Sequence, residues 1–124
     1  MQVLVVEDDA HNRDMMVRRF VRRGFDIGVA VDGPEALDLA VSARPNLILL
    51  DVLLPRMSGL EVARKLQDTA ETSHIPILAI SSNEAMREAS IAAGCRAFIV
   101  KPVDFTLLFA LIESLGLRGS SVAS

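Results

Sequence analysis

The 124-residue sequence predicts an α/β fold, in which a five-stranded parallel sheet is covered by helices on both faces as a doubly wound three-layer sandwich. Strand-like and helix-period segments alternate five times, which is a (βα)5 pattern. The strand-like runs, such as 47–50, are apolar without alternation, which is typical of strands buried on both faces. The connections are short, and crossovers between parallel strands are almost always right-handed.

The pattern assigns each element in turn. The strands are predicted near 2–6, 26–30, 46–50, 76–80 and 96–100. The helices are predicted near 10–23, 33–43, 58–70, 84–93 and 104–115. Gly24 ends the first helix, because a left-handed glycine commonly terminates helices. Asp32-Gly33-Pro34 opens the second helix with a turn and a proline suited to the first helical turn. Ser58 can cap the third helix, Ser82 or Asn83 the fourth, and Asp104 the fifth.

Composition excludes several classes of protein. A net charge of −3 gives no electrostatic case for direct nucleic-acid binding. The apolar runs have the length of strands, so no membrane span is expected. Lone Cys95 has no partner for an intramolecular disulfide, and no basic leader precedes the first strand, so we expect a cytoplasmic protein. One domain is expected over 1–118 with a disordered tail at 119–124, which fits a stand-alone protein slightly better than an excised domain.

Acidic residues follow two of the predicted strands. The cluster Glu7-Asp8-Asp9 ends the first strand, and Asp51 ends the third. Parallel strands present their carboxyl ends at one edge, where ligands bind in such sheets. Carboxylates about 5 Å apart repel by roughly 3 kcal/mol per pair at an effective dielectric near 20. A cation must offset that repulsion, and Mg²⁺ suits two carboxylates with waters and a phosphate.

Two further polar residues end strands at the same edge. Ser81 follows the fourth apolar run and Lys101 follows the fifth. Either residue alone is more often a solvated or capping group. The joint order of acids, hydroxyl and ammonium along the chain is specific.

With these motifs the chain resembles the receiver domain of two-component response regulators, of the CheY-like single-domain type, over residues 2–116. The motifs that carry the resemblance are Val5-Val6-Glu7-Asp8-Asp9, Leu50-Asp51-Val52-Leu53-Leu54-Pro55-Arg56-Met57-Ser58-Gly59, Ala79-Ile80-Ser81-Ser82 and Phe98-Ile99-Val100-Lys101-Pro102. The resemblance implies a flavodoxin-like strand order, 2-1-3-4-5. It also implies a phosphorylation-dependent signalling switch, and not an enzyme beyond its own phosphorylation and slow dephosphorylation.

The resemblance implies a role for each residue of the site. Asp51 accepts a phosphoryl group from a phosphohistidine on a sensor histidine kinase or a histidine phosphotransfer protein. Asp51 would also bind Mg²⁺, together with Glu7, Asp8 and the backbone carbonyl of Leu53. Lys101 would offset charge on the phosphoryl oxygens.

The resemblance also implies how the switch operates. Ser81 would hydrogen-bond the phosphoryl group and draw its loop toward the site. Phe98 would then turn inward and change the surface formed by 84–93, 96–100 and 104–115. A phenylalanine within a strand is by default a core residue, and this interpretation stays open.

Two partner surfaces are predicted. The first helix presents basic and polar residues, on which we expect the phosphodonor to dock. The last helix is apolar over a wide arc, which indicates a homodimer or partner interface through the fourth and fifth helices. The residues expected at these surfaces are Met15, Arg18, Arg19, Arg22, Leu107, Phe109 and Leu111.

Two alternatives use the same acidic edge. A degenerate receiver would act only as a protein-binding module, which the complete set of acids, hydroxyl and lysine disfavours. A Mg²⁺-dependent phosphatase of the haloacid-dehalogenase type would also use an aspartyl phosphate. Such enzymes typically place a second aspartate two residues after the nucleophile, where this chain has Leu53.

Overall fold

The structure, a computed structural model, describes residues 1–119. Its five strands are β1 (Gln2–Val6), β2 (Asp26–Ala30), β3 (Leu47–Asp51), β4 (Ile77–Ser81) and β5 (Ala97–Val100). Its helices are α1 (Ala10–Arg22), α2 (Gly33–Ala43), α3 (Gly59–Asp68), α4 (Arg87–Ala92) and α5 (Phe105–Ser114), with a 3₁₀ turn, η1 (Glu84–Met86), before α4. The alternation of strands and helices predicted from the sequence is confirmed.

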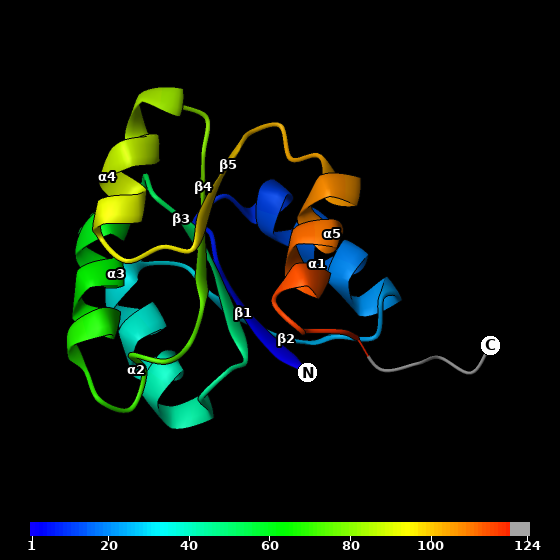
Figure 1. Cartoon of the computed structure of the whole chain (residues 1–124), viewed down its shortest axis with the longest axis horizontal. Helices are drawn as coiled ribbons and strands as arrows, with labels where there is room; N and C mark the ends of the chain where they lie inside the picture. Colours follow the sequence, from blue (N-terminus) through cyan, green and yellow to red (C-terminus); the bar gives the residue numbers. More distant parts are fainter. Residues whose placement is uncertain (120–124) are drawn as a thin grey trace.

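The five strands form one parallel sheet in the order β2-β1-β3-β4-β5, as predicted. Helices α1 and α5 cover one face, and α2, α3 and α4 cover the other (Figure 1). The connection that leaves β1 therefore runs to one face of the sheet, and the connection that leaves its neighbour β3 runs to the other face. Ligand sites of doubly wound sheets lie beyond the strand ends at such a point.

Each face of the sheet has its own hydrophobic core, and alternate residues of β3 show how one strand serves both. Leu47 and Leu49 pack in the core beneath α1 and α5, whereas Ile48 and Leu50 pack in the core beneath the other three helices. All five residues of β3, including Asp51, are buried. An unbroken apolar strand is therefore required here, because neither face meets water.

Side-chain caps fix where most helices begin. Ser58 and Asp104 each accept a backbone N–H bond at the start of α3 and α5, as predicted, and Asp32 does so at the start of α2. Asp9 does the same for α1, where its carboxylate accepts the Asn12 N–H at 2.8 Å. Caps of this kind satisfy backbone donors that lack a partner within the helix.

The fourth helix differs from the single segment expected at 84–93. It starts with η1 and continues as the short α4. The Asn83 side chain accepts the Ala85 N–H at 3.0 Å, two residues on, which favours a tight local turn in place of a regular first helical turn.

The remaining expectations concern the chain as a whole. Of the tail predicted at 119–124, residues 120–124 lie outside the described residues, and the domain limit at 118 stays a prediction. Within residues 1–119, the helices are too short or too polar to span a membrane.

Candidate functional site

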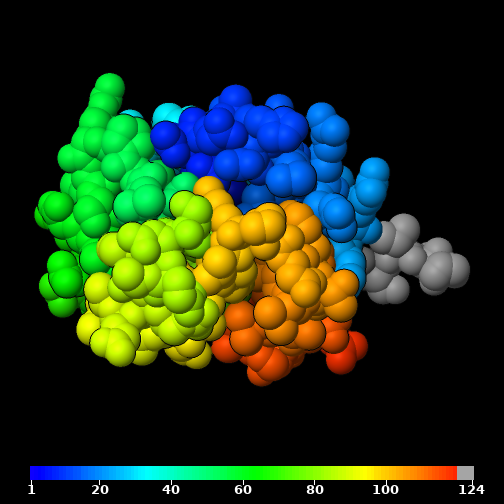
Figure 2. All heavy atoms as spheres, turned by 90° about the horizontal axis from the view of Figure 1, so that it is seen from above, coloured from blue at the N-terminus to red at the C-terminus, as the bar shows by residue number. Residues whose placement is uncertain are grey.

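Four predicted site residues lie at the carboxyl ends of four strands. Glu7 follows β1, Asp51 ends β3, Ser81 ends β4 and Lys101 follows β5. Figure 2 looks onto this edge from above, where the blue start of α1, the orange segment between β5 and α5, and the green and yellow-green segments meet. Residues separated by most of the chain are thus brought to one place by strand order alone.

Lys101 joins the two buried acids. Its ammonium nitrogen Nζ lies 2.8 Å from Glu7 Oε1 and 3.1 Å from Asp51 Oδ2. The side chains of Glu7 and Asp51 are only 5% and 8% exposed, against 23% for Lys101. The lysine therefore reaches into the site from a partly solvated position and offsets part of the acidic charge before any metal binds.

Burial and the neighbouring charges together set the pKa values of Glu7 and Lys101. Loss of water around Glu7, with Asp51 adding to the effect, raises the pKa of the Glu7 carboxyl above its ordinary value of 4.5 although Lys101 opposes the shift. Burial acts to lower the pKa of Lys101, but hydrogen bonds to Glu7 and Asp51 and their negative charges outweigh it, so that this pKa is raised. Lys101 is therefore cationic at neutral pH.

Glu7, Asp8 and Asp51 form a candidate metal site. Each contributes a carboxylate oxygen, and these oxygens all lie within 4.8 Å of one another. Glu7 and Asp51 are buried while Asp8 is exposed, so the cluster has one side open to solvent. Hard carboxylate oxygens with room for water fit Mg²⁺, which keeps several of its waters. Asp9 is engaged instead as the cap of α1.

The loop after β3 holds the Asp51 carboxylate from the other side. The Leu53 N–H donates a 2.9 Å hydrogen bond to Asp51 Oδ1, while Lys101 holds Oδ2. Both carboxylate oxygens are therefore fixed in orientation. The Leu53 side chain is 54% exposed next to the site, and the use of its carbonyl as a metal ligand stays a prediction.

Ser81 and Phe98 lie on the two strands beyond β3. Ser81 is fully buried, and its Oγ accepts the Asn83 N–H at 3.1 Å, which ties the residue to the loop that follows. The Lys101 N–H donates to the Ser81 carbonyl at 2.9 Å, so the serine and the lysine are direct neighbours across β4 and β5. Phe98 is 6% exposed and packs in the core beneath α2, α3 and α4, so its ring already lies inward in this structure, whereas the resemblance implied that it turns inward on phosphorylation.

Residues 3–113 match the model of the response regulator receiver domain. The chain belongs to this family. It is 36% identical over 116 residues to response regulator PleD of Caulobacter vibrioides, covering 92% of this chain and 26% of PleD. It is 37% identical over 117 residues to response regulator MprA of Mycobacterium avium, covering 93% of this chain and 50% of MprA. The chain thus spans between a quarter and a half of the length of these relatives.

A solved receiver domain bears on the acidic site. The receiver domain of sensor histidine kinase PA1611 from Pseudomonas aeruginosa superposes with a TM-score of 0.84 at 26% identity, covering 94% of this chain and 98% of that one. That structure holds a magnesium ion coordinated in its active-site cleft. Receiver domains bind Mg²⁺ in their acidic site, and the carboxylates found here provide a donor set of that kind.

The predicted surface on α1 is exposed in this receiver domain. Met15 is 41% exposed, and Arg18, Arg19 and Arg22 are also exposed. Arg19 additionally stacks on the ring of Phe105 in α5, with its guanidinium carbon 4.5 Å from the ring centroid. Arg19 thus helps to pack α1 against α5.

The predicted surface on α5 needs correction. Leu107 is 59% exposed and Leu111 is partly buried, but Phe109 is only 4% exposed. Its ring centroid lies 4.9 Å from that of Phe20, and Arg23 covers it at 4.3 Å. The wide apolar arc of α5 therefore has two neighbours, the sheet and α1, and Phe109 is unavailable to a partner.

A groove of about 550 Å³ runs from the acidic site along α1 and α5. Its inner end is formed by Glu7 and Lys101. Its walls are largely apolar and include Met15, Arg19, Val103 and Phe105.

Two arginines at the site were not predicted. Arg13 Nη1 donates to the backbone carbonyls of Glu7 at 3.0 Å and Asp8 at 3.3 Å, and so braces the acidic loop. Arg87 at the start of α4 donates to the carbonyl of Phe98 at 3.3 Å. The only sequence signal for the role of Arg13 was its position one turn into the helix that follows the acids. No sequence signal pointed to the role of Arg87.

Proposed function

We propose that this receiver domain accepts a phosphoryl group on Asp51 from a phosphohistidine of a sensor histidine kinase or histidine phosphotransfer protein. The observation that carries the proposal is the Asp51 carboxylate, buried and held by the Leu53 N–H and Lys101 beside two further acids. An Asp51 oxygen forms a bond to phosphorus as the phosphorus–nitrogen bond of phosphohistidine breaks and its electron pair returns to the imidazole. The product is an aspartyl phosphate, which we expect to be hydrolysed slowly.

The residues around Asp51 fit this chemistry. Phosphoryl transfer depends mainly on positioning and on stabilising charge at the phosphoryl oxygens. The Lys101 ammonium, 3.1 Å from Asp51 Oδ2, is placed to stabilise that charge. Glu7, Asp8 and Asp51, with the Leu53 carbonyl, would hold Mg²⁺, which when bound supplies further positive charge at the phosphoryl oxygens.

The readout we propose runs through Ser81 and Phe98. The phosphoryl group brings about two negative charges and three acceptor oxygens, and the Ser81 hydroxyl is the donor on the neighbouring strand. Movement of Ser81 toward that group draws the loop before α4 with it, because Asn83 is bonded to the Ser81 Oγ. The surface of α4, β5 and α5 changes as a result and alters partner binding.

For the phosphodonor we propose docking on α1 and the adjoining groove. The groove leads to Lys101 and Glu7. The exposed arginines of α1, namely Arg18, Arg19 and Arg22, favour an acidic partner surface. The double variant Arg18→Glu/Arg22→Glu should slow transfer from a phosphorylated protein donor while leaving labelling by acetyl phosphate unchanged. An equal loss of phosphorylation rate with both donors would show that these arginines do not take part in docking.

The proposal also includes self-association through α4, β5 and α5. Leu107 and Val100 remain exposed there at 59% and 37%, although Phe109 is buried. Sedimentation with and without beryllofluoride, a phosphoryl mimic, tests it. A monomer under both conditions at high concentration would exclude the dimer.

The experiment that tests the function is intact mass after incubation with acetyl phosphate and Mg²⁺. The expected result is one added phosphate, absent from Asp51→Asn and absent when a chelator removes the metal. No addition, under conditions that label a known receiver, would favour the degenerate binding module. Release of phosphate from added phosphomonoesters at many turnovers would instead favour a phosphatase.

A further inference from the structure

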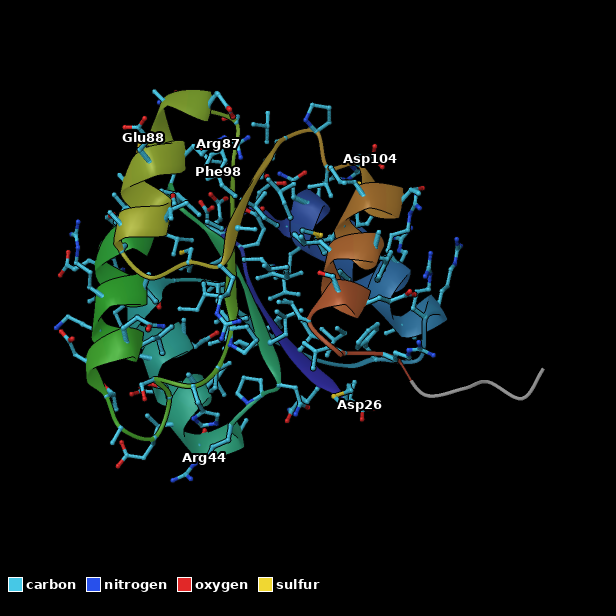
Figure 3. The ribbon with its side chains drawn as sticks, in the orientation of Figure 1. Asp26, Arg44, Arg87, Glu88, Phe98 and Asp104 are labelled. Carbon is cyan, nitrogen blue, oxygen red and sulfur yellow. The ribbon has the colours of Figure 1, made fainter. Side chains whose placement is uncertain are left out.

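The guanidinium of Arg87 makes contacts in three directions. Nε and Nη2 bind the two carboxylate oxygens of Glu84 at 2.7 and 3.1 Å. Nη1 donates to the Phe98 carbonyl at 3.3 Å, and the guanidinium carbon lies 5.0 Å from the centroid of the Phe98 ring. Figure 3 shows Arg87 and Phe98 side by side between α4 and β5, with Glu88 on the outer side of the helix.

These contacts join two parts of the switch. Glu84 opens η1, which follows Asn83, and Asn83 is hydrogen-bonded to Ser81 Oγ. A continuous series of contacts therefore runs from Ser81 through the loop to Glu84, then to Arg87, and from there to the backbone and ring of Phe98. Within this series, Arg87 is the residue that crosses from the loop to β5.

A surface ion pair within one helical turn would account for only part of this geometry. The Arg87–Glu84 pair is exposed, and such pairs alone contribute little to stability. An ion pair of that kind does not require the same guanidinium to reach the carbonyl of Phe98 and to cover its ring. A planar guanidinium can donate in several directions while stacking on an aromatic face, which a lysine ammonium cannot do.

We propose that Arg87 is a positioning residue that holds Phe98 in its inward place and couples that ring to the loop carrying Ser81. The proposal rests on the function proposed above and assigns a regulatory contact to the same site. Movement of the loop shifts Glu84, and Glu84 shifts the guanidinium that covers the ring. Loss of Arg87 leaves the loop and the ring to move independently.

The test uses the full chain labelled with 4-fluorophenylalanine and followed by fluorine NMR. The chain has five phenylalanines, so the Phe98 resonance is assigned from its loss in Phe98→Leu. Arg87→Met keeps much of the side-chain length and removes every polar contact. Because about half of the Arg87 side chain is exposed, at 48%, the variant should fold, which circular dichroism checks. Arg96→Met is the matched control, since Arg96 is exposed and bonds the sheet through its backbone N–H.

In Arg87→Met, the ratio of outward to inward Phe98 ring should rise about fivefold, with the other four resonances unchanged. Arg87→Lys should not restore the inward ring, and Arg96→Met should match the wild type. Glu84→Gln should weaken the response of the Phe98 resonance to phosphorylation, and adding it to Arg87→Met should have no further effect. A Phe98 resonance in Arg87→Met identical to that of the wild type would overturn the proposal.

Intact mass on the same samples separates this proposal from the function on which it rests. If the wild type gains no phosphate, the proposed function fails, and the fluorine spectra of the unmodified proteins still decide whether Arg87 holds the ring. If wild type and Arg87→Met gain phosphate equally and their Phe98 resonances respond alike, the function stands and the coupling role of Arg87 is excluded.

Discussion

Lys101 donates a 2.8 Å hydrogen bond to Glu7 although 94 positions separate them in the chain. The same ammonium lies 3.1 Å from Asp51, so one cation serves two buried carboxylates. Two negative charges and one positive charge leave an excess negative charge at the site, before exposed Asp8 is added. The site therefore carries a net negative charge by itself, and this charge favours binding of a divalent cation.

The raised pKa of Glu7 predicts a characteristic pH dependence. The folded protein binds a proton at Glu7 more tightly than the unfolded chain does, so the free energy of unfolding falls as pH rises from about 4.5 through the raised pKa. Glu7→Gln mimics the neutral form and should lack this decline. Without metal, the variant should be more stable than the wild type at pH 8, and the difference should disappear near pH 4.5.

Urea unfolding between pH 4.5 and 8 in the presence of a chelator measures this difference. Added Mg²⁺ should reverse the order at pH 8, because only the wild type retains both buried carboxylates for the metal. A Glu7→Gln protein less stable than the wild type at pH 8 without metal would show that the bond to Lys101 outweighs the burial of the charge.

We predict that the Arg13 side chain strengthens Mg²⁺ binding although it is not a metal ligand. Its guanidinium holds the carbonyls of Glu7 and Asp8, and loss of such a support typically weakens metal binding at least tenfold. Arg13→Met should therefore raise the dissociation constant for Mg²⁺ by about tenfold. Isothermal titration measures it, with Arg18→Met, an exposed arginine on the same helix, as the control. Equal losses in both variants would point to general electrostatics rather than to support of the loop.

Much of this fold was predictable because apolar runs without alternation define buried parallel strands. Such a sheet then places Glu7, Asp51 and Lys101 at one edge without any knowledge of side-chain contacts. The contacts of Arg13 and Arg87 were not predictable, because they depend on side-chain rotamers and on how far each helix is rotated. Phe109 was misassigned because a wide apolar arc indicates burial but does not tell a second intramolecular neighbour from a partner.

We predict that position 59 must be glycine, because the backbone next to Asp51 leaves no room for a side chain there. A Cβ atom at this position would lie 2.6 Å from the Asp51 carbonyl oxygen and 2.6 Å from the Val52 Cα. Because backbone atoms cannot yield as a side chain can, Gly59→Ala should lower the free energy of unfolding by about 2 kcal/mol. It should also slow phosphorylation by displacing the end of β3.

Gly28→Ala is the matched control, because its added Cβ would meet only Leu4 Cδ1 at an ordinary 3.7 Å. Thermal and urea unfolding of both variants measure the difference. Similar stabilities for Gly59→Ala and Gly28→Ala would show that α3 shifts away from β3 at little cost.

We predict that Leu53 lengthens the life of the aspartyl phosphate. Its backbone N–H is bonded to Asp51, and the residue is 54% exposed, so an apolar residue in contact with water directly neighbours the phosphorylation site. An apolar group there hinders the approach and orientation of the water that hydrolyses the phosphoryl group, whereas an amide can hydrogen-bond that water. Leu53→Asn should therefore shorten the phosphoryl half-life by about fivefold, which corresponds to about 1 kcal/mol of barrier height.

The half-life is measured by intact mass after the labelled protein is separated from acetyl phosphate. Leu107→Asn provides the control, because Leu107 is similarly exposed but lies on α5, which carries none of the residues that contact Asp51. Both variants should bind Mg²⁺ as the wild type does, since neither alters a carboxylate. An unchanged half-life in Leu53→Asn would mean that water reaches the phosphoryl group by a path that Leu53 does not cover, with the loop at Asn83 as the remaining approach.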